Sequence, residues 1–219
     1  MYAGGWASNK GTNLFYIKNK ESSESFVNRI FLSILMTDKF DGFTFYTHNL
    51  GRFDSIFILN SLITNKNISI EPIWKDNAIL SLSIKYKKIK IKILDYLQLI
   101  PGTLENILIS YNCNVKKGYF PYDFVNKNNL NYIGDKPSKE FYKNITDIVY
   151  SSIPNSNWDL KKETLKYLRS DLEGLLEILS KFNENIFSKY KLNITKFKTI
   201  SGLALAIYRS SYLPENLKS

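Results

Sequence analysis

The sequence predicts an α/β fold in which a mixed sheet is flanked by helices. Three observations lead to this class. Apolar runs of strand type alternate with stretches of helical period in the first half of the chain. One buried strand pattern ends in polar residues and passes at once into a helix pattern. A β-rich stretch then gives way to helices. At 219 residues with 44% hydrophobic side chains, the chain can bury a sizeable core.

Four elements are predicted before residue 66. Residues 1–18 hold two apolar pieces around turn chemistry, which predicts a hairpin. Ser-Ser-Glu at 22–24 precedes apolar side chains at helical spacing, so a helix is expected at about 23–37. Residues 43–47 are typical of a buried strand, and residues 53–65 of a helix.

Residues 68–97 have a β pattern, with strands expected at 68–74, 78–86 and 88–94 and a hairpin tip at 85–88. Isoleucines alternate with lysines here, so one face of the hairpin is basic. The alternating pairs are Ile84, Ile89, Ile91 and Ile93 with Lys85, Lys88, Lys90 and Lys92. A solvated strand face with edge-protecting lysines explains this at least as well as DNA contact does.

The second half is predicted to be mainly helical. Helices are expected at about 103–110, 138–151, 159–190 and 199–211, with a loop-like stretch at 112–135. The longest helix carries leucines at a helical period: Leu165, Leu168, Leu172, Leu175, Leu176 and Leu179.

Charge and composition narrow the class of function. The formal net charge is +10, which favours a polyanion partner, although a lysine-rich solvated surface gives the same value. The single cysteine, Cys113, excludes an internal disulfide and is expected to be structural. No apolar run reaches the ~18–20 residues of a membrane span, and the first residues do not have the form of a signal peptide, so no membrane partner is expected.

Two short patterns could carry chemistry. In the first, His48 and Asn49 follow a strand and Asp54 lies just inside the next helix. Asn49 could equally cap that helix, and Asp54 could complement its dipole. In the second, Tyr167 and Asp171 are four residues apart on one helical face. A carboxylate there could hold a hard cation while the phenol holds a water.

Taken together and in this order, HNLGRFDSIFIL and YLRSDLEGLLEIL resemble the second and third motifs of the 3′–5′ exonuclease domain of family B DNA polymerases. The likeness is to the protein-primed branch, found in linear plasmids, mitochondrial elements and some phages and viruses. Further stretches agree with it: DYLQLIPGTL at 95–104, KGYFP at 117–121 and the segment 194–204. The resemblance implies a ribonuclease H-like (DnaQ-like) exonuclease fold.

The chain departs from the family pattern in two ways. The family's first motif, an Asp-x-Glu on the first strand, has no counterpart, because no Asp or Glu precedes Glu21. The fold is therefore expected to miss its first strand. The second departure is an expectation: the resemblance ends near the boundary of the exonuclease domain, so a polymerase domain is expected to be absent. We expect a truncated exonuclease domain over residues 1–213 and a tail over 214–219 toward the absent polymerase domain.

The resemblance also implies roles for individual residues. Asp171 and Asp54 would hold Mg²⁺ or Mn²⁺ in a two-metal site that is incomplete in this chain. Tyr167 would orient the attacking water, which makes Asp54, Tyr167 and Asp171 the expected catalytic residues. The frayed 3′ end of DNA would be held by the remaining matches: Asn49, Phe53, Thr103, Leu104, Lys117 and Phe120, with His48 as a neighbour.

The expected function is therefore a part of a DNA-directed DNA polymerase that acts in replication, corresponding to the proofreading exonuclease and having little or no activity alone. A non-catalytic single-stranded-DNA-binding remnant and an inert pseudogene product are the alternatives. Expected partners are a single-stranded 3′ end and, through the parent protein, a terminal protein or polymerase module. The expected location is the mitochondrion.

Overall fold

The computed structural model describes residues 1–51, 55–75 and 78–214. The chain forms two compact units, each built from two separate stretches. Unit 1 comprises Met1–Asn19 and Leu104–Glu177, and unit 2 comprises Lys20–Thr103 and Ile178–Ser219. Strands and helices occur in both, so the predicted α/β class is confirmed.

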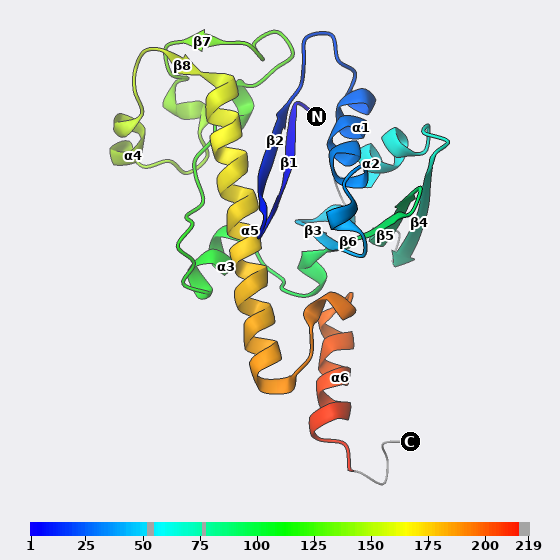
Figure 1. The fold of residues 1–219 in the computed structure, drawn as a ribbon. Helices are drawn as coiled ribbons and strands as arrows, with labels where there is room; N and C mark the ends of the chain where they lie inside the picture. Colours follow the sequence, from blue (N-terminus) through cyan, green and yellow to red (C-terminus); the bar gives the residue numbers. More distant parts are fainter. Residues whose placement is uncertain (52–54, 76–77, 215–219) are drawn as a thin grey trace. The chain divides into compact units, whose positions relative to one another are not determined.

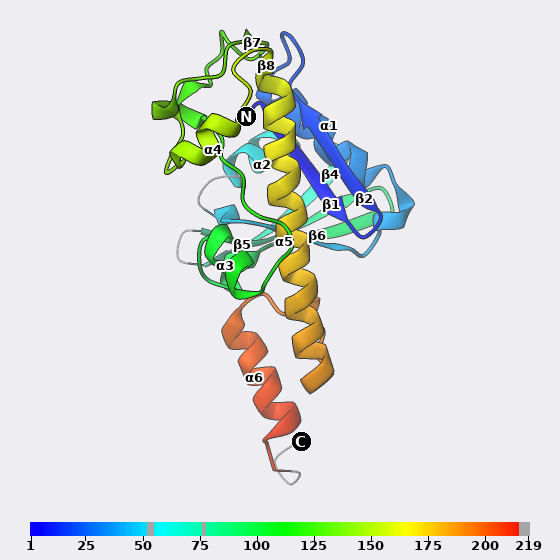
Figure 2. The same cartoon turned by 90° about the vertical axis from the view of Figure 1, so that its left-hand side faces the viewer.

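Unit 1 contains the N-terminal hairpin and the first part of the longest helix. β1 (Ala3–Ser8) pairs antiparallel with β2 (Gly11–Tyr16), as the turn residues between them predict. Both Figure 1 and Figure 2 show this hairpin beside α5 (Leu160–Tyr190). A Cβ atom on Gly5 would lie 3.2 Å from the side chain of Leu172, so the close approach of hairpin and helix favours glycine at this position.

The rest of unit 1 is organised by an aromatic core. Phe120, Trp158 and Leu160 are buried together, and Phe124, Val125, Tyr132, Ile153 and Tyr167 pack against them. Two short strands, β7 (Ile133–Gly134) and β8 (Trp158–Asp159), pair antiparallel beside this core. The predicted helix near residue 104 is confirmed as α3 (Leu104–Ser110).

The helix predicted over 138–151 is wrong in extent. Helix α4 comprises only Asp147–Ser152 and starts after Thr146, whose side-chain oxygen accepts a hydrogen bond from the Val149 amide. Just upstream, Asn144 has a φ of 58°, in the left-handed region that a right-handed helix cannot contain. The backbone at Asn144 therefore prevents one continuous helix.

Unit 2 is built on a four-stranded mixed sheet with the order β3-β6-β5-β4. β3 (Thr44–Thr47) runs parallel to β6 (Ile89–Asp95), whereas β5 (Ala78–Tyr86) runs antiparallel to both β6 and β4 (Ile68–Lys75). Because Thr47 lies opposite Asp95 in the parallel pair, both strands end at the same edge of the sheet.

The two faces of this sheet differ strongly in burial and in charge. Ile89, Ile91 and Ile93 of β6 are buried, while the intervening Lys90 and Lys92 are exposed. Helices α1 (Ser23–Leu35) and α2 (Ser55–Leu62) pack on each other and contact β6 and β4, respectively. These helices and the isoleucines form the main core of unit 2, and the lysines face away from it.

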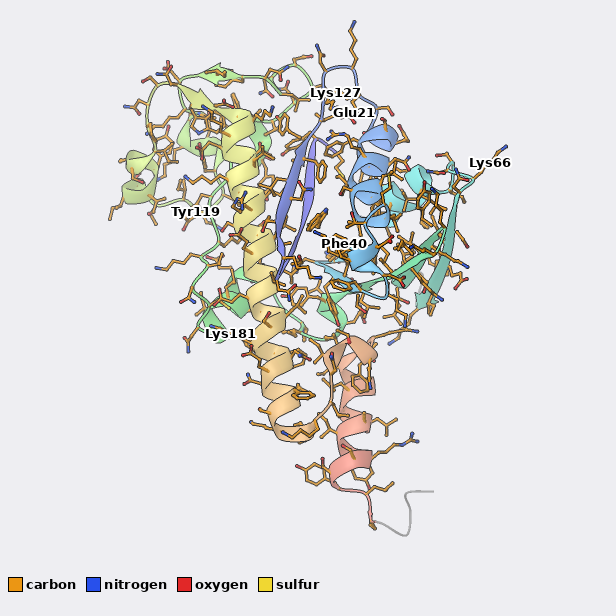
Figure 3. All side chains as sticks on the ribbon, viewed as in Figure 1. Glu21, Phe40, Lys66, Tyr119, Lys127 and Lys181 are labelled. Atoms are coloured by element: carbon orange, nitrogen blue, oxygen red, sulfur yellow. The ribbon has the colours of Figure 1, made fainter. Side chains whose placement is uncertain are left out.

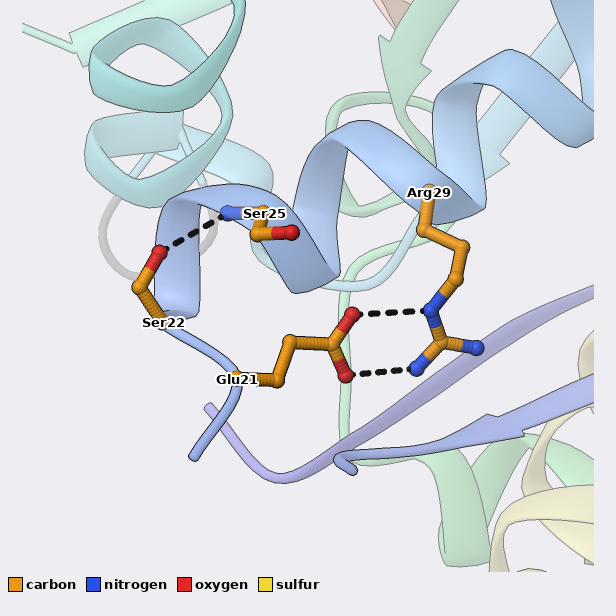
Figure 4. Close-up of polar contacts among 4 residues, drawn as sticks. All are labelled: Glu21, Ser22, Ser25 and Arg29. Atoms are coloured by element: carbon orange, nitrogen blue, oxygen red, sulfur yellow. Dashed lines mark hydrogen bonds and ion pairs between the residues drawn. The ribbon is translucent and has the colours of Figure 1, made fainter. Parts of the chain in front are cut away.

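The start of α1 is fixed by polar contacts that Figure 4 shows. The Ser22 hydroxyl accepts a hydrogen bond of 3.1 Å from the Ser25 amide, which satisfies one free donor of the first turn. Beside it, the Arg29 guanidinium donates to both oxygens of Glu21, at 2.9 and 2.8 Å. This planar two-bond pair joins the segment before the helix to its second turn.

The remaining helix predictions are confirmed closely. Helix α5 runs to Tyr190, and α6 (Ile200–Ser211) follows the N-cap Thr199. In the part of the chain that the structure describes, none of the helices combines the length and apolarity that crossing a bilayer requires.

Candidate functional site

The inward stripe of α5 carries two polar residues of the predicted site. The buried side chains of this helix recur at spacings of three and four: Leu160, Thr164, Leu175, Ile178 and Phe182. Tyr167 and Asp171 fall in the gap between Thr164 and Leu175 at the same helical period. The helix therefore directs a phenol and a carboxylate inward at a place where a purely structural helix would carry apolar side chains.

Most of the leucines named from the sequence lie outside this stripe. Of the six, Leu175 is buried, and the other five are half-buried. The helical period was predicted correctly, but the deepest face is turned away from most of the leucines. It is the face that contains Tyr167 and Asp171.

Residues 114–120 run along α5 and are held to it by side chains of the helix. The Glu177 carboxylate accepts hydrogen bonds from the Asn114 amide at 2.9 and 3.0 Å. About two helical turns earlier, the Ser170 hydroxyl donates to the Lys116 carbonyl at 2.8 Å. These contacts position the following Lys-Gly-Tyr-Phe-Pro segment against the helix.

Three aromatic rings meet where this segment passes Tyr167. The centroids of Phe120 and Tyr122 lie 5.4 and 5.7 Å from that of Tyr167, and 5.2 Å from each other. A Cβ atom on Gly118 would lie 3.4 Å from the Tyr167 ring, so the backbone there also touches it. Phe120 is 5% exposed and Tyr122 is 49% exposed, so only Tyr122 offers a large ring surface to a ligand.

Asp171 is held in an environment that disfavours its charged form. Its Oδ1 is buried and has no hydrogen-bond partner among the described residues. Burial raises the pKa of the Asp171 carboxyl, and the Tyr167 hydroxyl and the Lys117 ammonium oppose that rise. Leaving a buried acceptor without a donor costs free energy of folding. This oxygen can therefore bind a cation or accept a hydrogen bond from a water or a ligand.

The neighbouring phenols remain protonated. Burial raises the pKa of Tyr167, and the nearby Tyr122 hydroxyl and Asp171 charge raise it further. Burial likewise raises the pKa of Tyr122, and that of Tyr2, just before β1, to about 12. These groups can therefore donate hydrogen bonds at neutral pH but cannot act as general bases.

His48 and Asn49, the described residues of the first short pattern, lie in unit 2 at the edge of the sheet where β3 and β6 both end. The Asn49 amide donates to Oδ1 of Asp95 at 3.0 Å, and the Leu97 amide donates to the same atom at 3.1 Å. The Gly51 amide reaches Oδ2 at a marginal 3.5 Å. Asn49 itself has a φ of 66°, so a buried carboxylate stabilises a left-handed residue just after the strand.

A cavity of about 490 Å³ opens at this end of the sheet. Its lining combines amide, ammonium and carboxylate groups with apolar side chains: Asn49, Gly51, Lys75, Ala78, Ile79, Leu80, Asp95, Leu97 and Gln98. His48 lies next to Asn49, and the centroid of its ring is 5.3 Å from that of Tyr96.

The other predicted residues have separate positions. Lys117 and Thr103 are exposed, whereas Leu104 is 7% exposed and contributes to the core. Leu104 and Phe120 are therefore buried side chains with little surface open to a ligand. Phe53 and Asp54 lie outside the described residues.

The described residues do not fit a two-metal centre. Within residues 1–51, 55–75 and 78–214, no group of three or more His, Cys, Asp or Glu side chains is gathered as such a centre requires. Asp171 can supply one oxygen ligand. The Asp95 carboxylate is already engaged by backbone amides.

Sequence reasoning missed two residues of these sites. Tyr122 lies only two residues beyond Phe120, and its exposure is what distinguishes it from that residue. Asp95 was predicted only as a member of the stretch 95–104, with no role of its own. Its role depends on the parallel register of β3 with β6, which the sequence pattern does not contain.

The sequence relationships define the class of this chain. Residues 34–218 match the family described as DNA polymerase type B, organellar and viral. This match covers most of the chain, so the chain belongs to that family.

Curated relatives agree with this assignment. A probable DNA polymerase of Agaricus bitorquis is 41% identical over 95% of this chain and 28% of its own length. Those of Podospora anserina and Neurospora intermedia are 32% and 31% identical, over 96% and 92% of this chain and 22% of each relative. The chain thus spans about a quarter of the length of these relatives. Among solved structures, Phi29 DNA polymerase complexed with single-stranded DNA aligns with a TM-score of 0.37 and 19% identity, over 86% of this chain and 35% of that one.

Proposed function

We propose that this chain corresponds to the 3′–5′ exonuclease region of a family B DNA polymerase and binds the single-stranded 3′ end of DNA during replication. Family membership and the order of the Asn49 and Tyr167–Asp171 motifs support this proposal. The mixed sheet with its parallel β3–β6 pair is compatible with a ribonuclease H-like fold, which forms part of the proposal.

The arrangement around Tyr167 is the observation that carries the proposal. A protonated phenol and a buried carboxylate oxygen without a donor lie on one stretch of α5, and the segment that runs along this stretch adds an exposed lysine and an exposed ring. Lys117 would attract a phosphate, and Tyr122 would stack on an unpaired base. Tyr167 would donate a hydrogen bond to a phosphate oxygen or a water.

We further propose that the chain by itself hydrolyses DNA slowly or not at all. Two divalent ions in a nuclease neutralise the phosphate and activate water, and they require several carboxylates. Among the described residues, Asp171 is the carboxylate available at the Tyr167 cluster, and its burial disfavours charge.

A non-catalytic single-stranded-DNA-binding role is the second candidate. The exposed ring of Tyr122 and the charge of Lys117 favour it, because neither needs a metal to bind a strand. In either role, we propose a mitochondrial setting with a polymerase module or terminal protein as partner. The organellar and viral family and the fungal relatives support this setting.

One experiment tests the function and separates the two roles. Binding of a fluorescent single-stranded 15-mer is measured with and without Mn²⁺, together with release of its 3′ nucleotide. We expect micromolar binding that weakens with salt, and negligible release. Lys117→Gln should weaken binding several-fold, while Lys143→Gln, an exposed lysine outside this site, should not.

Binding that requires Mn²⁺ would favour the metal-dependent role over the second candidate. Release of 3′ nucleotides that disappears in Asp171→Ala would overturn the proposed lack of hydrolysis. The absence of binding by the folded wild-type chain would overturn both roles.

A further inference from the structure

The face of the unit 2 sheet that lies opposite α1 and α2 carries an uncompensated group of lysines. Lys85 of β5 lies directly opposite Lys90 of β6, and Lys92 lies opposite Ser83. The three lysine side chains are exposed. We call Lys85, Lys90 and Lys92 the lysine face.

Protection of a sheet edge does not explain these lysines. Natural sheets place lysine on edge strands to prevent pairing with other chains. In the order β3-β6-β5-β4, however, β5 and β6 are the two inner strands. Lys85 and Lys92 are paired with a strand on each side. Lys90 is paired with β5 on one side, and on the other its backbone bonds the Asp41 carboxylate and the Gly42 amide. The backbone beside all three lysines is therefore already hydrogen-bonded.

The charges of the lysine face are also not balanced within the sheet. Like charges directly opposite each other destabilise a strand pair, with Cβ atoms only about 5 Å apart. Among the described residues, none of the three lysines forms an ion pair, whereas the neighbouring Lys88 pairs with Asp38 at 2.9 Å. One acidic side chain lies on the same face, Glu71 of β4, opposite Ser83. A polyanionic partner would offset the repulsion.

We propose that the lysine face binds the phosphate backbone of double-stranded DNA. Lys90 and Lys92 are about 7 Å apart along the strand, with Lys85 across from Lys90. Duplex DNA presents one negative charge per ~1.7 Å of its axis, so three ammonium groups at this spacing meet several phosphates together.

Duplex is favoured over single-stranded DNA by the chemistry of the face. Sequence-neutral sites for single strands combine positive charge with aromatic rings on which bases stack. The positions that share the face with the lysines are Thr44, Tyr46, Ser69, Glu71, Ile73, Ser81, Ser83 and Leu94. The aromatic one, Tyr46, is half-buried and its hydroxyl is enclosed, so it does not present an open ring beside the lysines. This surface is therefore suited to a backbone and is distinct from the Tyr122 site.

The test compares two variants that change net charge equally. Lys85, Lys90 and Lys92 are replaced by glutamine in one. In the matched control, Lys66, Lys127 and Lys143 are replaced, which are exposed and lie outside the sheet; Figure 3 shows Lys66 projecting away from the ribbon. Binding of a fluorescent 20-base-pair blunt duplex is titrated between 25 and 200 mM salt, and thermal melts verify that both variants fold.

The lysine-face variant should bind the duplex at least tenfold more weakly at low salt. Its slope of log affinity against log salt should be smaller by about 2 to 3, since each neutralised phosphate contributes ~0.9. The control should lose less than threefold. Equal losses of duplex affinity in the two variants would overturn the proposal. Wild-type protein that does not bind the duplex would also overturn it. A larger loss for a single strand than for the duplex would overturn the choice of duplex. Asp171→Asn should leave duplex affinity unchanged, which separates this proposal from that for the 3′ end.

Discussion

The ring of Tyr122 meets the ring of Tyr167 edge to face, with centroids 5.7 Å apart and planes at 85°. This contact joins the Lys-Gly-Tyr-Phe-Pro-Tyr segment to the polar stripe of α5. Phe120 fills the space beneath it. Tyr122 is exposed and can stack on a ligand, whereas Phe120 is buried and can only pack beneath the other rings. Substitution of these two residues should therefore have different consequences.

Tyr122→Leu should weaken single-stranded DNA binding by about five- to thirtyfold, since stacking on one base contributes ~1–3 kcal/mol. Its thermal stability should change little. Phe120→Leu should instead lower the free energy of unfolding by about 1–2 kcal/mol, because a buried ring is lost from a packed core. Anisotropy titrations and urea denaturation measure the two effects. A Phe120 variant that folds normally but loses DNA affinity would restore Phe120 as a direct DNA contact.

Asp171 should make stability depend on pH. A carboxyl group whose pKa is raised on folding binds protons more tightly in the folded chain. Its contribution to stability is then complete below the unfolded pKa and is lost as the pH rises through the folded value. Asp171→Asn should therefore be more stable than the wild type at pH 7, by about 1 kcal/mol if the unpaired oxygen costs a typical amount.

Thermal melts of both proteins between pH 4 and pH 7 measure this effect. The advantage of Asp171→Asn should grow as the pH rises. A difference that is constant across this range, or that favours the wild type at pH 7, would show that the carboxylate is compensated by groups beyond Tyr167 and Lys117.

Substitutions at Asn49 can separate the effect of its left-handed backbone conformation from the effect of its side-chain amide. At a φ of 66°, Asn49→Ala should cost about 1 kcal/mol of stability, while Asn49→Gly should cost less than about 0.5 kcal/mol. Both variants should lose affinity for a single-stranded 3′ end. If Asn49→Gly binds as well as the wild type, the amide has no role in binding and the residue is structural.

Asp95 should be one of the most sensitive positions of unit 2. Asp95→Ala removes the acceptor for the amides of Asn49 and Leu97, so stability should fall by about 2–4 kcal/mol. Asp95→Asn retains one acceptor oxygen and should lose roughly half as much. Urea denaturation tests both variants, with Asp123→Ala, at an exposed position in unit 1, as control. A loss below 0.5 kcal/mol for Asp95→Ala would mean that water replaces the carboxylate.

Local sequence signals predicted the elements well wherever a cap or turn marked the boundary. The side chains of Ser22 and Thr199 accept hydrogen bonds from the amides of Ser25 and Gly202, and both helices start within one residue of the prediction. The helix over 138–151 failed because its interruption depends on one left-handed residue, Asn144, which the apolar period does not reveal.

The candidate site was harder to predict because it depends on which helix face is buried. The period of α5 was clear from its leucines, but the buried face follows from packing against Phe120, which is 40 or more residues away in sequence, and Trp158 just before the helix. The positions of Tyr122 and Asp95 likewise depend on contacts between separate segments, the Tyr122–Tyr167 ring contact and the β3–β6 pairing, which residue spacing does not predict. The Tyr167–Asp171 pair was found from its spacing together with the family resemblance, not from its periodicity.

The central claim, that this chain holds the 3′ end of a single strand, is tested most directly with 2-aminopurine placed at either end of a 15-mer. The fluorescence of this base rises when it is unstacked from its neighbours and falls when it stacks on an aromatic ring. We predict a change for the 3′-terminal probe, little change for the 5′-terminal probe, and loss of the 3′ change in Tyr122→Leu. Equal changes at both ends, or a 3′ change that survives Tyr122→Leu and Lys117→Gln together, would contradict the account.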